Sequence, residues 1–217
     1  YQTSNGGVLW HPVDAGPHTS ISSVAVSPWH TGHVVATGSL QEGFVARPVV
    51  LVTVDDGLTW SAGSTEELIR LGGQIFTGAN PDRLLAGSNA GVYTSLDGGW
   101  TWFRANTGDP HQCGWTSFYA SWECDDATTS LVVDPTNANV VYGLRGRRVW
   151  RSADGATSWS PFGEGLPPAS ISSLSIAPDG RRLFVAPNGA GTWSVEVGPT
   201  VLVASHRPPR LLLRAGR

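Results

Sequence analysis

Short stretches in which apolar and small polar residues alternate recur along the chain. Ile21–Pro28 (Ile-Ser-Ser-Val-Ala-Val-Ser-Pro) and Ile171–Pro178 (Ile-Ser-Ser-Leu-Ser-Ile-Ala-Pro) show the alternation most clearly. A period of two residues is typical of β-strands that bury one face, and the stretches are separated by residues that favour turns. The pattern predicts an all-β chain of short strands joined by tight turns.

The predicted strands group into successive units of about four. Residues 104–128 form a long insertion between two of these units. Residues 205–217 depart from the pattern, with four Arg and two adjacent Pro, and we expect a disordered basic tail there. The expected units lie at about 20–62, 72–104, 128–162 and 170–204, with a leading half unit at 1–12.

An octapeptide of the form Ser/Thr-x-Asp/Asn-x-Gly-x-x-Trp occurs four times, with Ala156 in the Gly place of the fourth copy. A short carboxylate or amide can accept hydrogen bonds from its own turn, Gly supplies a positive φ, and a hydroxyl adds a further bond. The Trp brings a large apolar ring into the next strand. The residues that define the repeat are Thr3, Asn5, Gly7, Trp10, Thr53, Asp55, Gly57, Trp60, Ser95, Asp97, Gly99, Trp102, Ser152, Asp154 and Trp159.

This octapeptide resembles the Asp-box, or BNR, repeat, which in its family joins the third and fourth strands of a β-propeller blade. Members of that family include sialidases, xyloglucan-degrading glycoside hydrolases, sortilin-type receptor domains and photosystem II assembly factors. The resemblance implies a β-propeller of four-stranded antiparallel blades with Asp-box turns. It implies no single activity, because a shared fold does not determine function.

The number of blades leaves two arrangements open. The Trp residues that end the octapeptides lie 50, 42 and 57 residues apart, and a four-stranded blade takes about 40–50 residues. Four nearly complete blades and a leading half blade can be part of a larger ring, or the leading hairpin can close a small ring by pairing with the last blade. We expect an incomplete propeller of about four to five blades, because the leading half lacks a first pair of strands. The chain also contains no Met, which indicates a processed product or a piece of a longer protein.

Composition narrows the classes of partner. The net charge of −3 favours neither nucleic acid nor an anionic membrane surface as a ligand. No apolar run approaches the roughly 20 residues that a membrane-spanning helix needs. Cys113 and Cys124 lie in one segment, and a disulfide between them predicts an oxidising compartment; the alternative is two unrelated thiols in a reducing cell. With the family resemblance, the disulfide predicts a secreted, periplasmic or extracellular protein.

The up-and-down order of strands in a blade separates two groups of turns. Turns between first and second strands, and the octapeptides, emerge on one face; the other turns and the links between blades emerge on the opposite face. We therefore interpret the Asp and Asn residues of the octapeptides as structural and not as catalytic pairs or calcium ligands. His30 and His33 have the spacing of half a metal site, but a solvated turn is the expected role, and we predict no metal and no cofactor.

The insertion at 104–128 carries the most informative candidates for binding. Its aromatic residues Trp115, Tyr119 and Trp122 lie among the carboxylates of Asp109, Glu123 and Asp126. Aromatic rings beside carboxylates suit sugar rings, whose C–H faces stack while their hydroxyls bond the acids. The alternative is a small core that caps the insertion, and long structured loops support either role.

A second candidate is the basic cluster of Arg145, Arg147 and Arg148. Strand geometry allows at most two of these side chains to share a direction, and a pair of guanidinium groups can receive a carboxylate or phosphate. The alternative is a solvated edge. We name Arg145 and Arg147 as ligand-binding candidates.

These residues lead to a hypothesis of a binding or interaction module for carbohydrate or protein. A glycoside hydrolase is the first alternative, with Asp109, Glu123 and Asp126 as weak candidates for a catalytic pair of carboxylates about 5–10 Å apart. The sequence lacks the Arg-Ile-Pro phrase ahead of the first octapeptide that a sialidase resemblance requires. An assembly scaffold is the second alternative, and the oligomeric state is not predicted.

Overall fold

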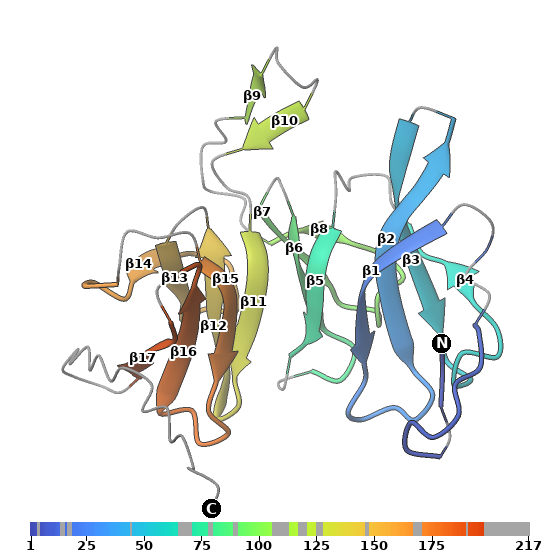
Figure 1. The fold of residues 1–217 in the computed structure, drawn as a ribbon, viewed down its shortest axis with the longest axis horizontal. Coiled ribbons are helices and arrows are strands. Elements are labelled where there is room, and N and C mark those ends of the chain that lie inside the picture. The colour runs from blue at the N-terminus through green and yellow to red at the C-terminus, as the bar shows by residue number, and fades with distance from the viewer. Residues whose placement is uncertain are drawn as a thin grey trace, which may run out of the picture.

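The computed structural model of the protein consists of β-strands joined by turns (Figure 1). It describes residues 1–3, 5–13, 16, 19–43, 45–64, 71–77, 80–88, 91–105, 113–116, 121–124, 128–145, 148–166, 171–189 and 191–197, with only the backbone given for 45, 71–74, 113–116, 121–124 and 129. Within these ranges there is no helix, and so none with the length and apolar character to cross a membrane.

Four antiparallel sheets follow one another in chain order, each with its strands in sequence order. Sheet 1 contains β1 (Thr19–Val26), β2 (Val34–Glu42), β3 (Val45–Thr53) and β4 (Ser61–Ala62). Sheet 2 contains β5 (Leu71–Phe76), β6 (Leu84–Ser88), β7 (Gly91–Ser95) and β8 (Phe103–Arg104). Sheet 3 contains β11 (Thr128–Asp134), β12 (Asn137–Arg145), β13 (Arg148–Ser152) and β14 (Ser160–Phe162). Sheet 4 contains β15 (Ile171–Ile176), β16 (Arg182–Pro187) and β17 (Trp193–Glu196).

Neighbouring sheets pack face to face, and their first strands lie on the same side of the row of sheets. The first strands of successive sheets are in contact, β1 with β5, β5 with β11 and β11 with β15, and Figure 1 shows the sheets as a row in chain order. Each junction between sheets has its own apolar core: Val50 contributes to the first, Leu85 to the second and Leu183 to the third. The predicted fold class, an all-β propeller of antiparallel four-stranded blades, is confirmed.

The central strands of sheet 2 show why the sequence folds in this way. Every residue of β6 and β7 is buried, because sheets 1 and 3 cover both faces of sheet 2. Gly87 in β6 approaches β11 so closely that an added Cβ would lie 2.3 Å from the carbonyl oxygen of Thr128. Only Gly permits this approach of two backbones.

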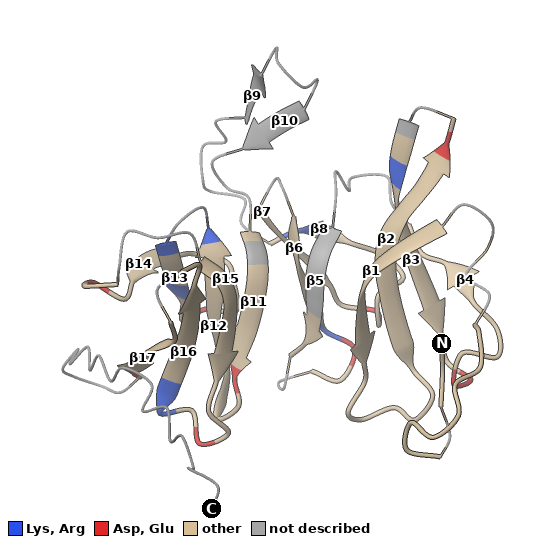
Figure 2. Cartoon of the chain, viewed as in Figure 1, with Lys and Arg blue, Asp and Glu red and all other residues tan. Residues whose placement is uncertain are grey.

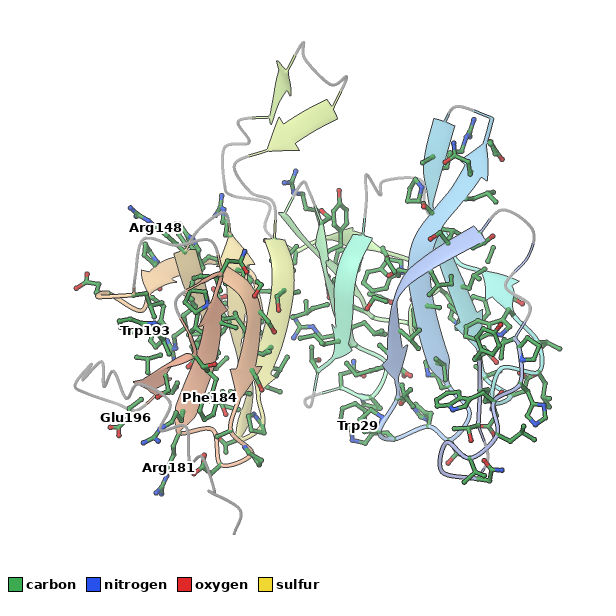
Figure 3. The ribbon with its side chains drawn as sticks, in the orientation of Figure 1. Trp29, Arg148, Arg181, Phe184, Trp193 and Glu196 are labelled. Atoms are coloured by element: carbon green, nitrogen blue, oxygen red, sulfur yellow. The ribbon has the colours of Figure 1, made fainter. Side chains whose placement is uncertain are left out.

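The two outer sheets differ in chemistry. The face of sheet 1 that points away from sheet 2 exposes Ile21, Val24 and Val26, whereas the outer face of sheet 4 carries the Arg182–Glu196 ion pair at 3.3 Å beside Phe184 (Figure 3). A leading hairpin with a bridge between Gln2 and His11 precedes sheet 1. The outer face of sheet 4 has the polar character of a terminal repeat, and the outer face of sheet 1 does not.

The turns form two faces, as the up-and-down order requires. We call the face with the octapeptides and the turns between first and second strands the octapeptide face. The opposite face, with the links between sheets and the turns between second and third strands, is the link face. Figure 2, in which the link face is uppermost, shows basic residues at the link-face ends of β3, β12 and β13.

Candidate functional site

The third octapeptide shows how the repeated turn is built. The Ser95 hydroxyl donates to Asp97 Oδ1 at 2.8 Å and accepts a bond from the backbone N–H of Gly99, also at 2.8 Å. Both the backbone N–H and the hydroxyl of Thr101 donate to the Asp97 carboxylate, and Trp102 Nε1 donates to the Gly99 carbonyl at 2.9 Å. The turn therefore uses both carboxylate oxygens internally.

The other copies repeat most of these bonds, although the Nε1 of Trp60 has no partner among the described residues. They also show one position that the sequence pattern did not include. Thr59 and Ser158, like Thr101, lie four residues after the Asp and donate their hydroxyls to its second oxygen. The first octapeptide has Leu9 there and Asn5 in place of the Asp. Aligning the four octapeptides with one another shows this hydroxyl, so the sequence contained the signal.

Two consecutive residues of each turn adopt a positive φ. In the third octapeptide these are Gly98 at +77° and Gly99 at +100°, but Asp56 at +60° and Ala156 at +74° hold the same positions elsewhere. Non-Gly residues in this region are strained. The fold therefore accommodates Ala156 at the position where the other octapeptides have Gly. Its methyl group is buried in the core between sheets 2 and 3.

The hydrogen bonds also determine the acidity of these carboxyl groups. The side-chain bond from Thr59, followed by the backbone and Thr53 bonds, lowers the pKa of Asp55 to about 2. The bond from the Ser158 hydroxyl, the largest cause, lowers the pKa of Asp154 to about 2. Because hydrogen bonds to the charged form make these groups strong acids, they are poor candidates for general acid or base catalysis near neutral pH.

The octapeptide turns also join neighbouring sheets. His33 of sheet 1 donates its Nε2–H to the Gly98 carbonyl at 2.8 Å, and Arg83 of sheet 2 donates to the Gly155 carbonyl of sheet 3. His33 is only 5 % exposed, so the solvated turn expected there is wrong for this residue. His30 is half exposed and pairs with Asp82 at 3.3 Å. Within the described ranges, no three His, Cys, Asp or Glu side chains are placed to hold a metal ion.

The insertion on the link face contains a two-stranded antiparallel ribbon of β9 (Cys113–Thr116) and β10 (Ser121–Cys124). Its register places Trp115 opposite Trp122 and Cys113 opposite Cys124. Because residues alternate between the two faces of a strand, both pairs fall on one face of the ribbon, and Glu123 falls on the other. Figure 1 shows the ribbon beyond the link-face ends of the sheets.

The backbone register is compatible with both sequence interpretations of this insertion. Residues directly opposite each other in antiparallel strands have Cα atoms about 4.5–5.5 Å apart, within the range of about 4.4–6.8 Å that disulfides span. Cross-strand pairs of aromatic residues in this register are known to interact in antiparallel sheets. Tyr119, Asp109 and Asp126 lie outside the described residues.

Two of the three arginines of the basic cluster lie within the described residues. Arg145 at the end of β12 lies opposite Arg148 at the start of β13, and Arg147 lies outside the described residues. The guanidinium carbon of Arg145 is 4.9 Å from the centre of the Trp150 ring, which is a cation–π contact. The sequence analysis missed Trp150, although its position two residues after Arg148 on a strand places both on one face.

An apolar cavity of about 420 Å³ lies elsewhere, between the leading hairpin and the outer face of sheet 1. Its walls include Tyr1 and Gln2 from the hairpin, Ile21 and Val24 from β1, and Trp60. Few polar groups converge on it, and it is remote in the chain from both the ribbon and the Arg pair. It continues the type of apolar surface that the other sheets bury against one another.

Comparison with known proteins identifies the fold and no family. No protein-family model matches the chain, and no curated protein matches it. A GH74 glycoside hydrolase from Niastella koreensis aligns at a TM-score of 0.65 and 16 % identity, over 85 % of this chain and 30 % of the enzyme. An auxiliary nutrient binding protein from Bacteroides thetaiotaomicron aligns at 0.59 and 10 % identity, over 88 % of this chain and 43 % of that protein.

A third similar structure is itself a β-propeller domain. The β-propeller domain of Cps50 (Swd1) from Myceliophteria thermophila aligns at a TM-score of 0.52 and 12 % identity, over 86 % of this chain and 57 % of that domain. The chain thus spans between about a third and just over half the length of these structures. At these identities the similarity establishes a β-propeller fold, shared with GH74 glycoside hydrolases and with other propeller proteins.

Proposed function

We propose that this chain is a carbohydrate-binding module whose binding surface is the link face. The observation that carries the proposal is the register of the β9–β10 ribbon, which sets Trp115 opposite Trp122. Two adjacent indole rings offer an apolar platform of the size of a sugar ring, and each adds one N–H donor for a hydroxyl. The Arg pair of the link face supplies charged hydrogen-bond donors, and Glu123 lies on the opposite face of the ribbon from the two Trp residues.

The comparisons support the ligand class. A GH74 glycoside hydrolase and an auxiliary nutrient binding protein both share the fold, one an enzyme and one a binding protein. The carboxylates of the octapeptide face accept hydrogen bonds within their own turns, so they are not available to a ligand. We therefore place the ligand on the link face. We further propose that the octapeptides are Asp-box repeats of the BNR type, and that a Cys113–Cys124 disulfide stabilises the ribbon in an oxidising compartment.

A glycoside hydrolase is the second candidate, and the similarity to the GH74 glycoside hydrolase favours it. Such an enzyme needs a carboxylic acid and a second carboxylate about 5–10 Å apart. Among the candidates, Glu123 has a described backbone position, opposite Gly114 in the ribbon. In this reading Glu123 is one of the two groups, and the sugar binds on the face of the ribbon that carries Glu123 and not on the face of the Trp pair.

A glycan array combined with a panel of fluorogenic glycosides tests the two candidates. We expect retention of a defined set of glycans, a loss of about tenfold or more in affinity in Trp115→Ala and Trp122→Ala, and no turnover. Trp10→Ala on the octapeptide face is the matched control, because it removes an exposed Trp from the leading hairpin. Turnover that disappears in Glu123→Gln would establish the hydrolase instead, and equal retention by all three Trp variants would exclude the ribbon.

A further inference from the structure

Two arginines face each other at the link-face end of sheet 3. Arg145 and Arg148 are the last register pair of the β12–β13 hairpin. Like charges directly opposite each other in an antiparallel pair are destabilising, and opposite residues have Cβ atoms about 4.5–5.5 Å apart. The hairpin therefore holds two guanidinium groups close enough to each other to contact one anion.

Trp150 gives one of these guanidinium groups a defined position. The contact at 4.9 Å holds Arg145 against the indole ring, and a stacked guanidinium loses less freedom when it binds a ligand. The Nε1 of Trp150 is buried and has no hydrogen-bond partner among the described residues. The half-buried ring of Trp150 and the stacked Arg145 form a more rigid base than two solvated arginines provide.

Other arginines of the described part are engaged differently. Arg47 pairs with Glu42 at 2.9 Å, Arg182 pairs with Glu196, and Arg83 donates to a carbonyl of the next sheet. Arg148, in contrast, is exposed and has no carboxylate within 4.0 Å among the residues described. Figure 3 shows Arg148 at the link-face end of sheet 3, and Arg181 at the opposite end of the molecule.

The side chains of Arg145 and Arg148 point to the side of sheet 3 from which the insertion with the ribbon enters. Val141 packs against Leu85 and Val92 of sheet 2, and by strand alternation Arg145 shares the face of β12 that carries Val141. Arg145 and Arg148 therefore point toward the side of sheet 3 that meets sheet 2. The insertion that carries the ribbon is the link between these two sheets.

We propose that Arg145 and Arg148, supported by Trp150, form a carboxylate-binding subsite, and that the ligand of the link face is an acidic glycan with uronate groups. The inference rests on the proposed function, because the ribbon aromatics bind the sugar while the arginines select its charge. A carboxylate accepts paired N–H bonds from guanidinium groups in a fixed geometry, so the subsite discriminates against neutral sugars.

Titration with oligogalacturonate and with its methyl ester tests the proposal, since the two probes differ in the carboxylate alone. We expect the wild-type chain to bind the acid at least about tenfold more tightly than the ester. Arg145→Gln with Arg148→Gln removes this preference, each single variant weakens it, and Arg181→Gln, which removes one positive charge on the octapeptide face as each single variant does on the link face, keeps it. The indole N–H resonance of Trp150, assigned with Trp150→Phe, shifts with the acid only when Arg145 is present.

The outcomes separate this inference from the proposed function. Equal binding of acid and ester that is lost in Trp115→Ala contradicts the carboxylate subsite and leaves the glycan-binding module intact. Absence of binding to both probes and to the glycan array overturns both. If dextran sulfate displaces oligogalacturonate at equal charge concentration, or if Arg181→Gln weakens binding as much as the double variant, the interaction is a general attraction of polyanions and the subsite is excluded.

Discussion

The octapeptide face and the link face of this propeller use polar residues in opposite ways. On the octapeptide face, the carboxylate of Asp97 accepts hydrogen bonds from Ser95 and Thr101. The carbonyl of Gly98 accepts a hydrogen bond from His33 of the preceding sheet. On the link face, Arg145 and Arg148 lie opposite each other, and the ribbon projects past the sheets. The difference supports the proposal that the octapeptide face maintains the fold and that the link face binds a ligand.

The largest expected effect is the removal of a carboxylate from the octapeptide face. Asp97→Ala leaves Ser95 and Thr101 without their shared acceptor, and we expect a loss of about 3 kcal/mol in the free energy of unfolding. Glycan affinity of the folded protein stays within about twofold. Urea unfolding and glycan titration of one preparation measure both quantities. Asn5→Ala in the exposed leading hairpin is the control, with a loss of about 1 kcal/mol or less.

The junction between sheets gives the next largest effect. A Cβ on Gly99 would lie 2.8 Å from Cγ2 of Val35 in sheet 1, and its φ of +100° is unfavourable for other residues. We expect Gly99→Ala to lower the free energy of unfolding by about 2 kcal/mol. Val35→Ala in the same chain makes room for the methyl group, and the double variant then loses less than the sum of the single losses. Strict additivity would contradict the contact.

Acid sharpens the comparison, because protonating an octapeptide carboxylate removes the charged form that the hydrogen bonds of its turn stabilise. The pKa of Asp154 is about 2 in the folded protein, below the ordinary value of 3.8. A depressed folded pKa stabilises the fold above pH 3.8, and this stabilisation is lost as the pH falls from 3.8 toward 2. The free energy of unfolding of Asp154→Asn therefore approaches that of the wild type as the pH falls through this window. A constant difference between the two proteins from pH 5 to pH 2 would contradict this assignment.

The smallest expected effect is a gain. Asp56 adopts a φ of +60° where the third and fourth octapeptides have Gly98 and Gly155. Asp56→Gly relieves that strain, and we expect stabilisation of about 0.5–1 kcal/mol in thermal unfolding. Ala156→Gly is the informative partner, because it relieves similar strain but removes a buried methyl group worth about 0.8 kcal/mol, so its net effect is near zero. Destabilisation by Asp56→Gly would show that its side chain has a further role.

The sequence predicted the fold class and the hydrogen bonds within the octapeptide turns, because these features depend on residues that are neighbours in the chain. The bonds of Asp55 and Asp154 all lie within one octapeptide. The bond from His33 was beyond sequence reasoning, since its acceptor Gly98 is 65 residues away and only the packing of sheets brings them together. The position of Arg148 opposite Arg145 also depends on the register of the hairpin, which decides the residues that face each other across two strands.

Hydrogen exchange of the backbone amides, with and without a saturating acidic glycan, tests most directly whether the link face binds the ligand while the octapeptide face maintains the fold. We expect slower exchange in peptides that cover 113–124 and 143–151, with unchanged exchange at 53–60, 95–102 and 152–159. Slower exchange at the octapeptides, with no change in the ribbon or the β12–β13 hairpin, would contradict the account.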